Sequence, residues 1–139
     1  MNILSILSQS PADAVEQLAE SILPKLGDVS VVFNRTGIAM LPYCDSAKGV
    51  TFHLGEVLMA DAHVECALPD GRVAEGYGAC LGRNTRHALA IALIDAAHRL
   101  DIHATEIHAF ASAQEVQLQS ADAELLDKVE RTRIEMETF

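Results

Sequence analysis

Tryptophan is absent from this sequence, and the other aromatic residues are few, with four Phe and two Tyr among 139 residues. Half of the residues are nevertheless hydrophobic. The core must therefore be built from Ala, Val, Leu and Ile. So apolar a composition favours a chain that buries surface against partners as well as within itself.

Long hydrophobic runs and cysteines are also scarce. No uninterrupted apolar run approaches the ~20 residues of a membrane span, and the N-terminus lacks the basic-then-apolar layout of a secretory signal. Cys44, Cys66 and Cys80 are the three cysteines, widely spaced and without a Cys-x-x-Cys pair. This pattern disfavours a disulfide framework and a structural zinc site. We expect a cytoplasmic protein with reduced thiols and no contact with a membrane.

Basic residues are half as frequent as acidic ones, ten against twenty, so the formal net charge is −10 at pH 7. Such a chain repels a phosphate backbone at long range, and we expect no nucleic-acid partner. A small anion site is not excluded, because local donors can outweigh the global field. The length predicts a single domain spanning residues 1–139.

Helix signals occur at three places. The stretch SPADAVEQLAESIL predicts an amphipathic helix with Ser10 as N-cap and Pro11 at its first position. Residues 85–100, TRHALAIALIDAAHRL, predict a helix capped by Asn84. Because this helix is apolar on almost every side, we expect it to be buried on more than one side. A third helix is predicted to run almost to the C-terminus.

Less regular segments lie between these helices. Residues 28–41 predict two short extended segments broken at the turn-rich tetrad 34–37, and residues 42–49 predict a loop. Residues 101–110 predict either one more strand or an irregular link. Ser112 and Glu115 have the spacing of a capping box at the start of the C-terminal helix.

Two extended runs flank Asp70-Gly71, a preferred hairpin turn. These elements together predict an α+β fold. An antiparallel sheet with this central hairpin is flanked by an N-terminal helix, a central buried helix and a C-terminal helix.

Pairing Pro69 with Arg72 predicts the register of the hairpin. Counting outward then places six residues on the apolar face toward the core: Ala62, Val64, Leu68, Val73, Tyr77 and Ala79. The opposite face carries a polar strip of Asp61, His63 and Glu65. On the partner strand, Gly78 lies opposite His63 and Gly76 opposite Glu65.

Alternate residues of a strand project together, so this polar strip offers a metal or acid–base site. A solvated strand face is the simpler interpretation. No Ser or Cys lies in a nucleophile motif. We therefore predict no catalytic residue and no metal site.

The most suggestive stretch is GRNTRH, residues 82–87, where a strand ends and a helix begins. The first turn of a helix leaves backbone N–H groups unpaired and carries a partial positive charge. Arg83 and Arg86 add guanidinium donors, and His87 adds a group that titrates near neutrality. Arg83, Asn84, Arg86 and His87 are therefore a candidate site for phosphate or phosphonate. In the alternative, Gly82 turns the chain, Asn84 caps the helix and the arginines are solvated.

Taken in order, FHLGEV and VECALPDGRVAEGYGACLGRNTRHALAIALIDA resemble the G subunit of the bacterial carbon–phosphorus lyase system, which processes phosphonates. LSQSPADAVEQLA, NRTGIAM and RIEMETF extend the resemblance over nearly the whole chain. Asn84 stands where that family usually has Asp, and both residues are good N-caps. Asp61 and Glu65 stand where basic residues are expected in many relatives.

The resemblance implies a subunit of a core complex with the H, I and J subunits. That complex supports formation of ribose 1-methylphosphonate 5-triphosphate from ATP and methylphosphonate. It implies a mainly accessory role, with ATP used by the complex and no cofactor bound by this chain alone, and self-association is a further expectation. The alternative is a stand-alone enzyme acting on a phosphorylated small molecule, with His87 as acid or base and Arg83 and Arg86 holding the phosphate.

Overall fold

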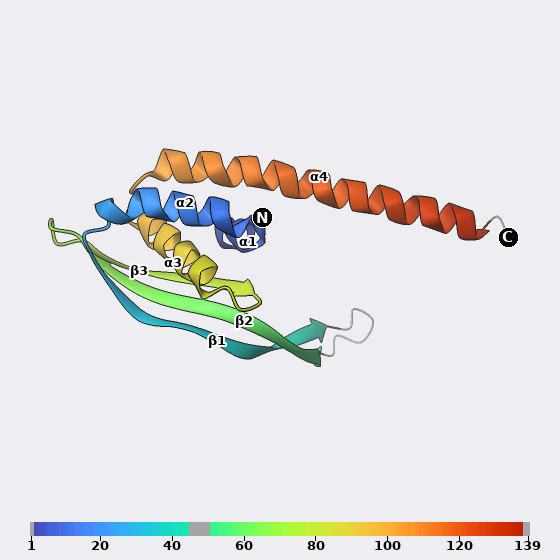
Figure 1. The fold of residues 1–139 in the computed structure, drawn as a ribbon, viewed down its shortest axis with the longest axis horizontal. Coiled ribbons are helices and arrows are strands. Elements are labelled where there is room, and N and C mark those ends of the chain that lie inside the picture. Colours follow the sequence, from blue (N-terminus) through green and yellow to red (C-terminus); the bar gives the residue numbers. More distant parts are fainter. Residues whose placement is uncertain (1, 45–50, 138–139) are drawn as a thin grey trace.

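A long three-stranded sheet lies beneath a layer of helices in the computed structural model (Figure 1). The structure describes residues 2–44 and 51–137, and the side chains of residues 2–40 and 55–131. Its strands are β1 (Asp28–Cys44), β2 (Thr51–Ala67) and β3 (Val73–Leu81), in the order β1-β2-β3 with both pairings antiparallel. The predicted α+β class is confirmed.

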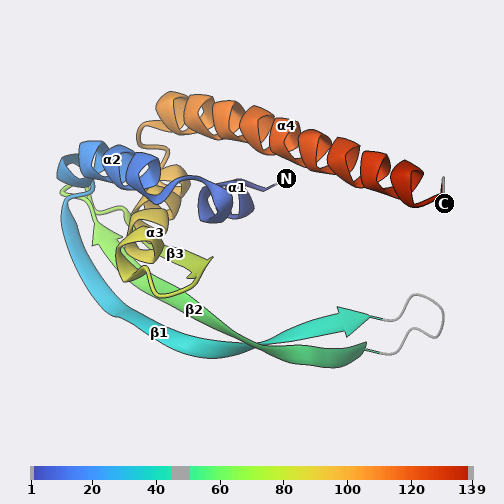
Figure 2. The ribbon, with the colours of Figure 1, turned by 45° about the vertical axis from the view of Figure 1, so that its right-hand side comes forward.

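The helices are α1 (Ile3–Gln9), α2 (Ala12–Ile22), α3 (Thr85–Arg99) and α4 (Ala104–Glu137), with a 3₁₀ turn, Leu23–Lys25, after α2. Helix α3 lies directly on β2 and β3, and α1 and α2 cover it from the other side (Figures 1 and 2). The expected burial of α3 on more than one side is confirmed. Its covering layers come from this chain itself.

The N-terminal helix differs from the prediction. Ser10 ends α1 instead of capping α2, because its hydroxyl donates to the carbonyl of Ile6 at 2.6 Å. Pro11 takes the N-cap position of α2 and makes no side-chain cap. Helix α1 itself was not predicted, and Asn2 caps it by accepting a hydrogen bond from the N–H of Ser5.

Strand β1 is continuous where a break was predicted. The tetrad Asn34–Gly37 pairs residue by residue with β2, and the register shifts lie on either side of it, between Val31 and Phe33 and between Leu41 and Pro42. A long partner strand supplies backbone hydrogen bonds throughout, so tertiary pairing overrides the local turn signal. Of the predicted loop at 42–49, residues 42–44 belong to β1, and 45–49 lie outside the described residues.

The hairpin between β2 and β3 is present, but its register differs by one residue from the prediction. The N–H of Leu68 donates to the carbonyl of Arg72, and the N–H of Gly71 donates to the carbonyl of Leu68. Gly71 has a φ of +95°, so the loop is a three-residue turn with its left-handed position at glycine. A two-residue loop would have paired Pro69 with Arg72, as assumed.

This one-residue difference moves the glycines to the other face. Gly78 pairs with Ala62 and Gly76 with Val64, on the side covered by α3. The close approach that glycine permits is therefore made by a helix of the same chain. Tyr77 and Glu75 move to the open face instead.

The segment after α3 matches the predicted irregular link only over residues 101–103, and residues 104–110 are helical. Residues 101–103 form a short turn, in which Asp101 and His103 have φ near +55°, and α4 begins at Ala104. Ser112 and Glu115 lie inside α4, so their spacing does not mark a helix start. The prediction that the final helix runs almost to the C-terminus is confirmed.

Candidate functional site

The junction of β3 and α3 is the predicted anion site. Gly82 turns the chain with a φ of +97°, and its N–H donates to the carbonyl of Leu58 at 2.8 Å. The side-chain oxygen of Asn84 accepts a hydrogen bond from the N–H of His87 at 3.0 Å. Asn84 is therefore the N-cap of α3, as predicted.

His87 points into the protein. The residue is 6 % exposed, and its Nε2 lies 2.9 Å from the carbonyl oxygen of Leu7 in α1. A carbonyl only accepts, so Nε2 must donate. This bond adds a second donor to a carbonyl that also accepts from the N–H of Ser10, and it ties α1 to α3. The imidazole is thus part of the packing between helices.

The two arginines of the junction are exposed, and among the described side chains neither forms an ion pair. Arg86 lines a groove between α2 and α3 together with Glu16 and Glu20. These carboxylates disfavour an anion beside Arg86. Arg83 lies at the turn itself.

The backbone donors of the junction are partly occupied as well. The N–H of Thr85 donates to the carbonyl of Arg83, and the N–H of His87 donates to Asn84. The four predicted residues therefore do not converge on one point in this structure. Anion binding here stays a prediction, centred on Arg83.

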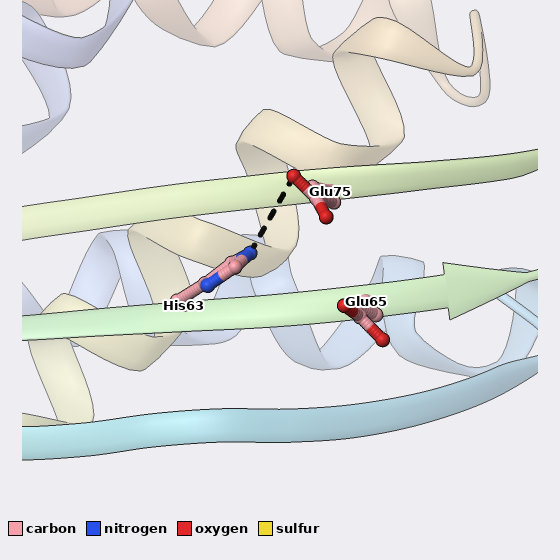
Figure 3. A group of neighbouring side chains, drawn as sticks. All are labelled: His63, Glu65 and Glu75. Carbon is pink, nitrogen blue, oxygen red and sulfur yellow. Dashed lines mark ion pairs between the residues drawn. The ribbon is translucent and has the colours of Figure 1, made fainter.

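The open face of the sheet carries a group of side chains, and the sequence predicted only some of its members to lie on this face. His63 is 9 % exposed, and its ring stacks on Tyr77 with a centroid distance of 4.2 Å. The interpretation of this face as solvated is therefore wrong for His63. Its Nε2 lies 3.7 Å from a carboxylate oxygen of Glu75 (Figure 3).

The other two residues of the predicted polar strip behave differently. Asp61 forms an ion pair with Arg35 on β1 at 3.3 Å. Glu65 is exposed and lies directly opposite Glu75. The predicted register placed Gly76 opposite Glu65, and for that reason Glu75 was not recognised as a neighbour.

Neither described cysteine is placed for nucleophilic chemistry. Cys66 and Cys80 are free thiols, 0 % and 3 % exposed. Burial raises the pKa of both thiols. A raised pKa keeps the thiol protonated at neutral pH, and the protonated form is a poor nucleophile.

The distal part of α4, residues 113–131, projects away from the helical layer. The β1–β2 ribbon, the two-stranded part of the sheet beyond the end of β3, extends in the same direction beneath it (Figures 1 and 2), and its described side chains are those of residues 37–40 and 55–59. The ribbon exposes three large apolar residues: Ile38, Met40 and Leu58. The distal part of α4 exposes four: Val116, Leu125, Leu126 and Val129. Exposed apolar side chains that gather on one projecting element are typical of interaction sites in soluble proteins.

The family model of the phosphonate metabolism protein PhnG matches residues 1–139, the whole chain. The chain belongs to the PhnG family. Its role is therefore in phosphonate metabolism, as the sequence resemblance predicted. No curated protein matches the chain. Within the described residues, no helix is both long and apolar enough to cross a membrane.

Proposed function

We propose that the chain is a mainly accessory subunit of a carbon–phosphorus lyase core complex containing the H, I and J subunits. The complex would convert ATP and methylphosphonate to ribose 1-methylphosphonate 5-triphosphate. ATP would be used by the complex and would not be held as a cofactor by this chain alone. We place the assembly in the cytoplasm, since Cys66 and Cys80 are free thiols.

The observation that carries this proposal is the exposure of apolar side chains on two projecting elements. Leu126 on α4 is 64 % exposed and Ile38 on the β1–β2 ribbon is 68 % exposed. Fully burying one such side chain against a partner would stabilise the complex by about 1.5–3 kcal/mol relative to leaving it in water. Helix α3 does not contribute to this argument, because its apolar residues are covered within the chain.

The alternative hypothesis, a stand-alone enzyme, loses its main support. Its acid or base was His87, and that imidazole is buried and hydrogen-bonded to the carbonyl of Leu7. A general acid or base needs to reach the substrate directly or through one water molecule. Arg86 lines the groove between α2 and α3, and neither His87 nor Arg83 is among the residues that line this groove.

Co-purification tests the proposal. The chain is expressed with and without the H, I and J subunits, and the products are weighed by native mass spectrometry. We expect a stable mixed complex that consumes ATP and methylphosphonate, and an isolated chain that is inert. A chain that ignores these partners, or that turns over a substrate by itself, would contradict the proposal.

A further inference from the structure

The open face of the sheet brings together one imidazole and two carboxylates. His63 and Glu65 lie two residues apart on β2, so they share a face, and Glu75 on β3 pairs directly with Glu65 (Figure 3). One ligand atom from each of the three side chains lies within 4.8 Å of the other two. We propose that these three residues form a binding site for a divalent transition-metal ion, with Zn²⁺ as the ion that best suits them.

The imidazole nitrogen that faces this cluster is buried and unsatisfied. Among the described residues, Nε2 of His63 has no hydrogen-bond partner, and only 11 % of the side chain is exposed. Its nearest charged neighbour is the carboxylate of Glu75, at 3.7 Å, which is too long for a hydrogen bond. A buried polar atom without a partner is uncommon in folded proteins. A bound metal ion would satisfy it through the nitrogen lone pair.

Two aromatic rings fix the direction of this nitrogen. Tyr77 stacks on the imidazole with an interplanar angle of 13°, and Phe33 meets it edge-on, with ring centroids 5.7 Å apart. The imidazole is thus held between strands β1 and β3. A ligand that is fixed before the metal arrives loses little conformational entropy on binding.

The two carboxylates repel each other as they stand. Glu65 and Glu75 are directly opposite on neighbouring antiparallel strands, an arrangement that destabilises a sheet when the charges are alike. Among the described side chains, no Lys or Arg pairs with either carboxylate. Arg35, the basic residue on the adjoining part of β1, is paired with Asp61 and lies over the ring of Phe33. A cation between the two glutamates would turn the repulsion into attraction.

The ligand set indicates the class of metal. One imidazole nitrogen with two carboxylates suits Zn²⁺ and its neighbours Co²⁺ and Mn²⁺, whereas Mg²⁺ and Ca²⁺ prefer oxygen alone. Ligand atoms around tetrahedral zinc lie about 3.4 Å apart, as its bond lengths of about 2.1 Å require. The exposed side chains of Glu65 and Glu75 can rotate inward to reach this spacing while His63 stays in place. The fourth position is left for water.

Zinc titration of the full chain tests the site. Chain treated with EDTA and dialysed is titrated with ZnCl₂ by calorimetry at pH 7.5. The folded state of every variant is checked by circular dichroism. We expect one saturable equivalent per chain and a rise in Tm with zinc. In Glu65→Gln/Glu75→Gln the affinity should fall at least about tenfold, by analogy with the loss of supporting groups at metal sites.

Three further variants make the result specific. His63→Gln should lose binding as the double variant does. Asp61→Asn, on the same strand but paired with Arg35, should keep it. His98→Gln alters a ring pair with His108 between α3 and α4 and should also keep the affinity. Should His63→Gln fail to fold, the exposed glutamates still decide the question.

Two outcomes would overturn the site. One is a wild-type chain with no saturable zinc binding. The other is a folded Glu65→Gln/Glu75→Gln variant that binds zinc as tightly as the wild type. Neither outcome bears on assembly with partner subunits, because the titration uses the isolated chain.

Discussion

A Cβ atom on Gly78 would lie 2.2 Å from the carbonyl oxygen of Ala88 on α3. Gly76 stands in the same relation to Ala92, at 2.0 Å. The helix therefore rests on the backbone of the edge strand through small residues spaced four apart. No side chain fits at either glycine unless α3 moves.

Gly78→Ala is expected to destabilise the chain, because the new methyl group would displace backbone atoms of α3. Overpacking of this kind costs about 1–3 kcal/mol or more. Urea denaturation followed by circular dichroism measures the change. Gly37→Ala is the matched control, since a Cβ there meets no atom within 4 Å. Equal stability of the two variants would contradict the packing described for α3.

Asp95 is expected to protect the backbone N–H of Tyr77, at the outer edge of β3, from exchange with solvent. Its carboxylate accepts a hydrogen bond from the N–H of Tyr77 at 2.9 Å, and Arg99 donates to the same oxygen at 3.3 Å. Asp95→Ala leaves a backbone donor without a partner and should cost about 1–3 kcal/mol. The Tyr77 amide should then exchange faster with solvent deuterium. Asp95→Asn keeps an acceptor and should retain part of the stability. Unchanged exchange in Asp95→Ala would show that the edge is protected in another way.

His87→Ala is expected to lower stability more than activity. The change removes the hydrogen bond from the imidazole to the carbonyl of Leu7, which keeps the N–H of Ser10 as a donor, so the loss should be about 0.5–1.5 kcal/mol. In a reconstituted complex, assayed well below its unfolding temperature, turnover should stay within about twofold of wild type. His87→Gln, which can still donate, should recover stability. A folded His87→Gln complex without turnover would restore a chemical role for the imidazole.

Arg83→Ala tests the anion prediction at the β3–α3 junction. If Arg83 binds an anionic group, the change should raise the KM of the complex for methylphosphonate or ATP at least severalfold, with little effect on kcat. Arg99→Ala is a suitable comparison, because Arg99 is paired with Asp95 on the same helix. An unchanged KM in Arg83→Ala would leave the junction with a structural role only.

The buried thiols predict a pH dependence of stability. Burial raises the pKa of Cys66 and Cys80 in the folded chain. The unfolded chain therefore loses these protons at lower pH than the folded chain does. The contribution of these two thiols to the free energy of unfolding should be constant below about pH 8 and fall as the pH rises through the ordinary thiol range, near 8.5–9. Urea denaturation between pH 7 and 10 measures it, and a Cys66→Ala/Cys80→Ala variant should show a weaker decline. A decline of the same size in that variant would assign it to other groups.

Much of the fold was predictable from sequence because the signals were local. Asn84 could be recognised as the cap of α3 from its own neighbours, and the length and apolar composition of that helix predicted its burial. The break assigned to residues 34–37 was wrong because the pairing that straightens β1 comes from a distant strand. The irregular link predicted for residues 101–110 was right only for residues 101–103, where Asp101 and His103 adopt positive φ, and residues 104–110 already belong to α4.

The candidate sites were less predictable, since they depend on register and side-chain direction. A single added turn residue moved Gly76 and Gly78 beneath α3 and placed Glu75 beside His63. The direction of His87 toward Leu7 depends on α1, which was not predicted. Apolar composition indicated interaction surfaces in general, but their location required the long β1–β2 ribbon and the projection of α4.

The two projecting elements should be needed for assembly and dispensable for folding. Leu125→Glu/Leu126→Glu on α4 and Ile38→Glu/Met40→Glu on the ribbon place charges on side chains that are at least 54 % exposed. Because these side chains already face water, the isolated variants should unfold within about 0.5 kcal/mol of wild type. A charge buried without a partner at an interface is costly, so the native mass spectrum of the co-expressed complex should lose this chain.

Gln119→Glu/Ser120→Glu adds the same two charges to exposed positions of α4 and controls for charge alone. Wild-type assembly in both apolar-to-Glu variants would mean that partners bind elsewhere, and the open sheet face around Val73 and Leu81 would then be examined by the same substitutions.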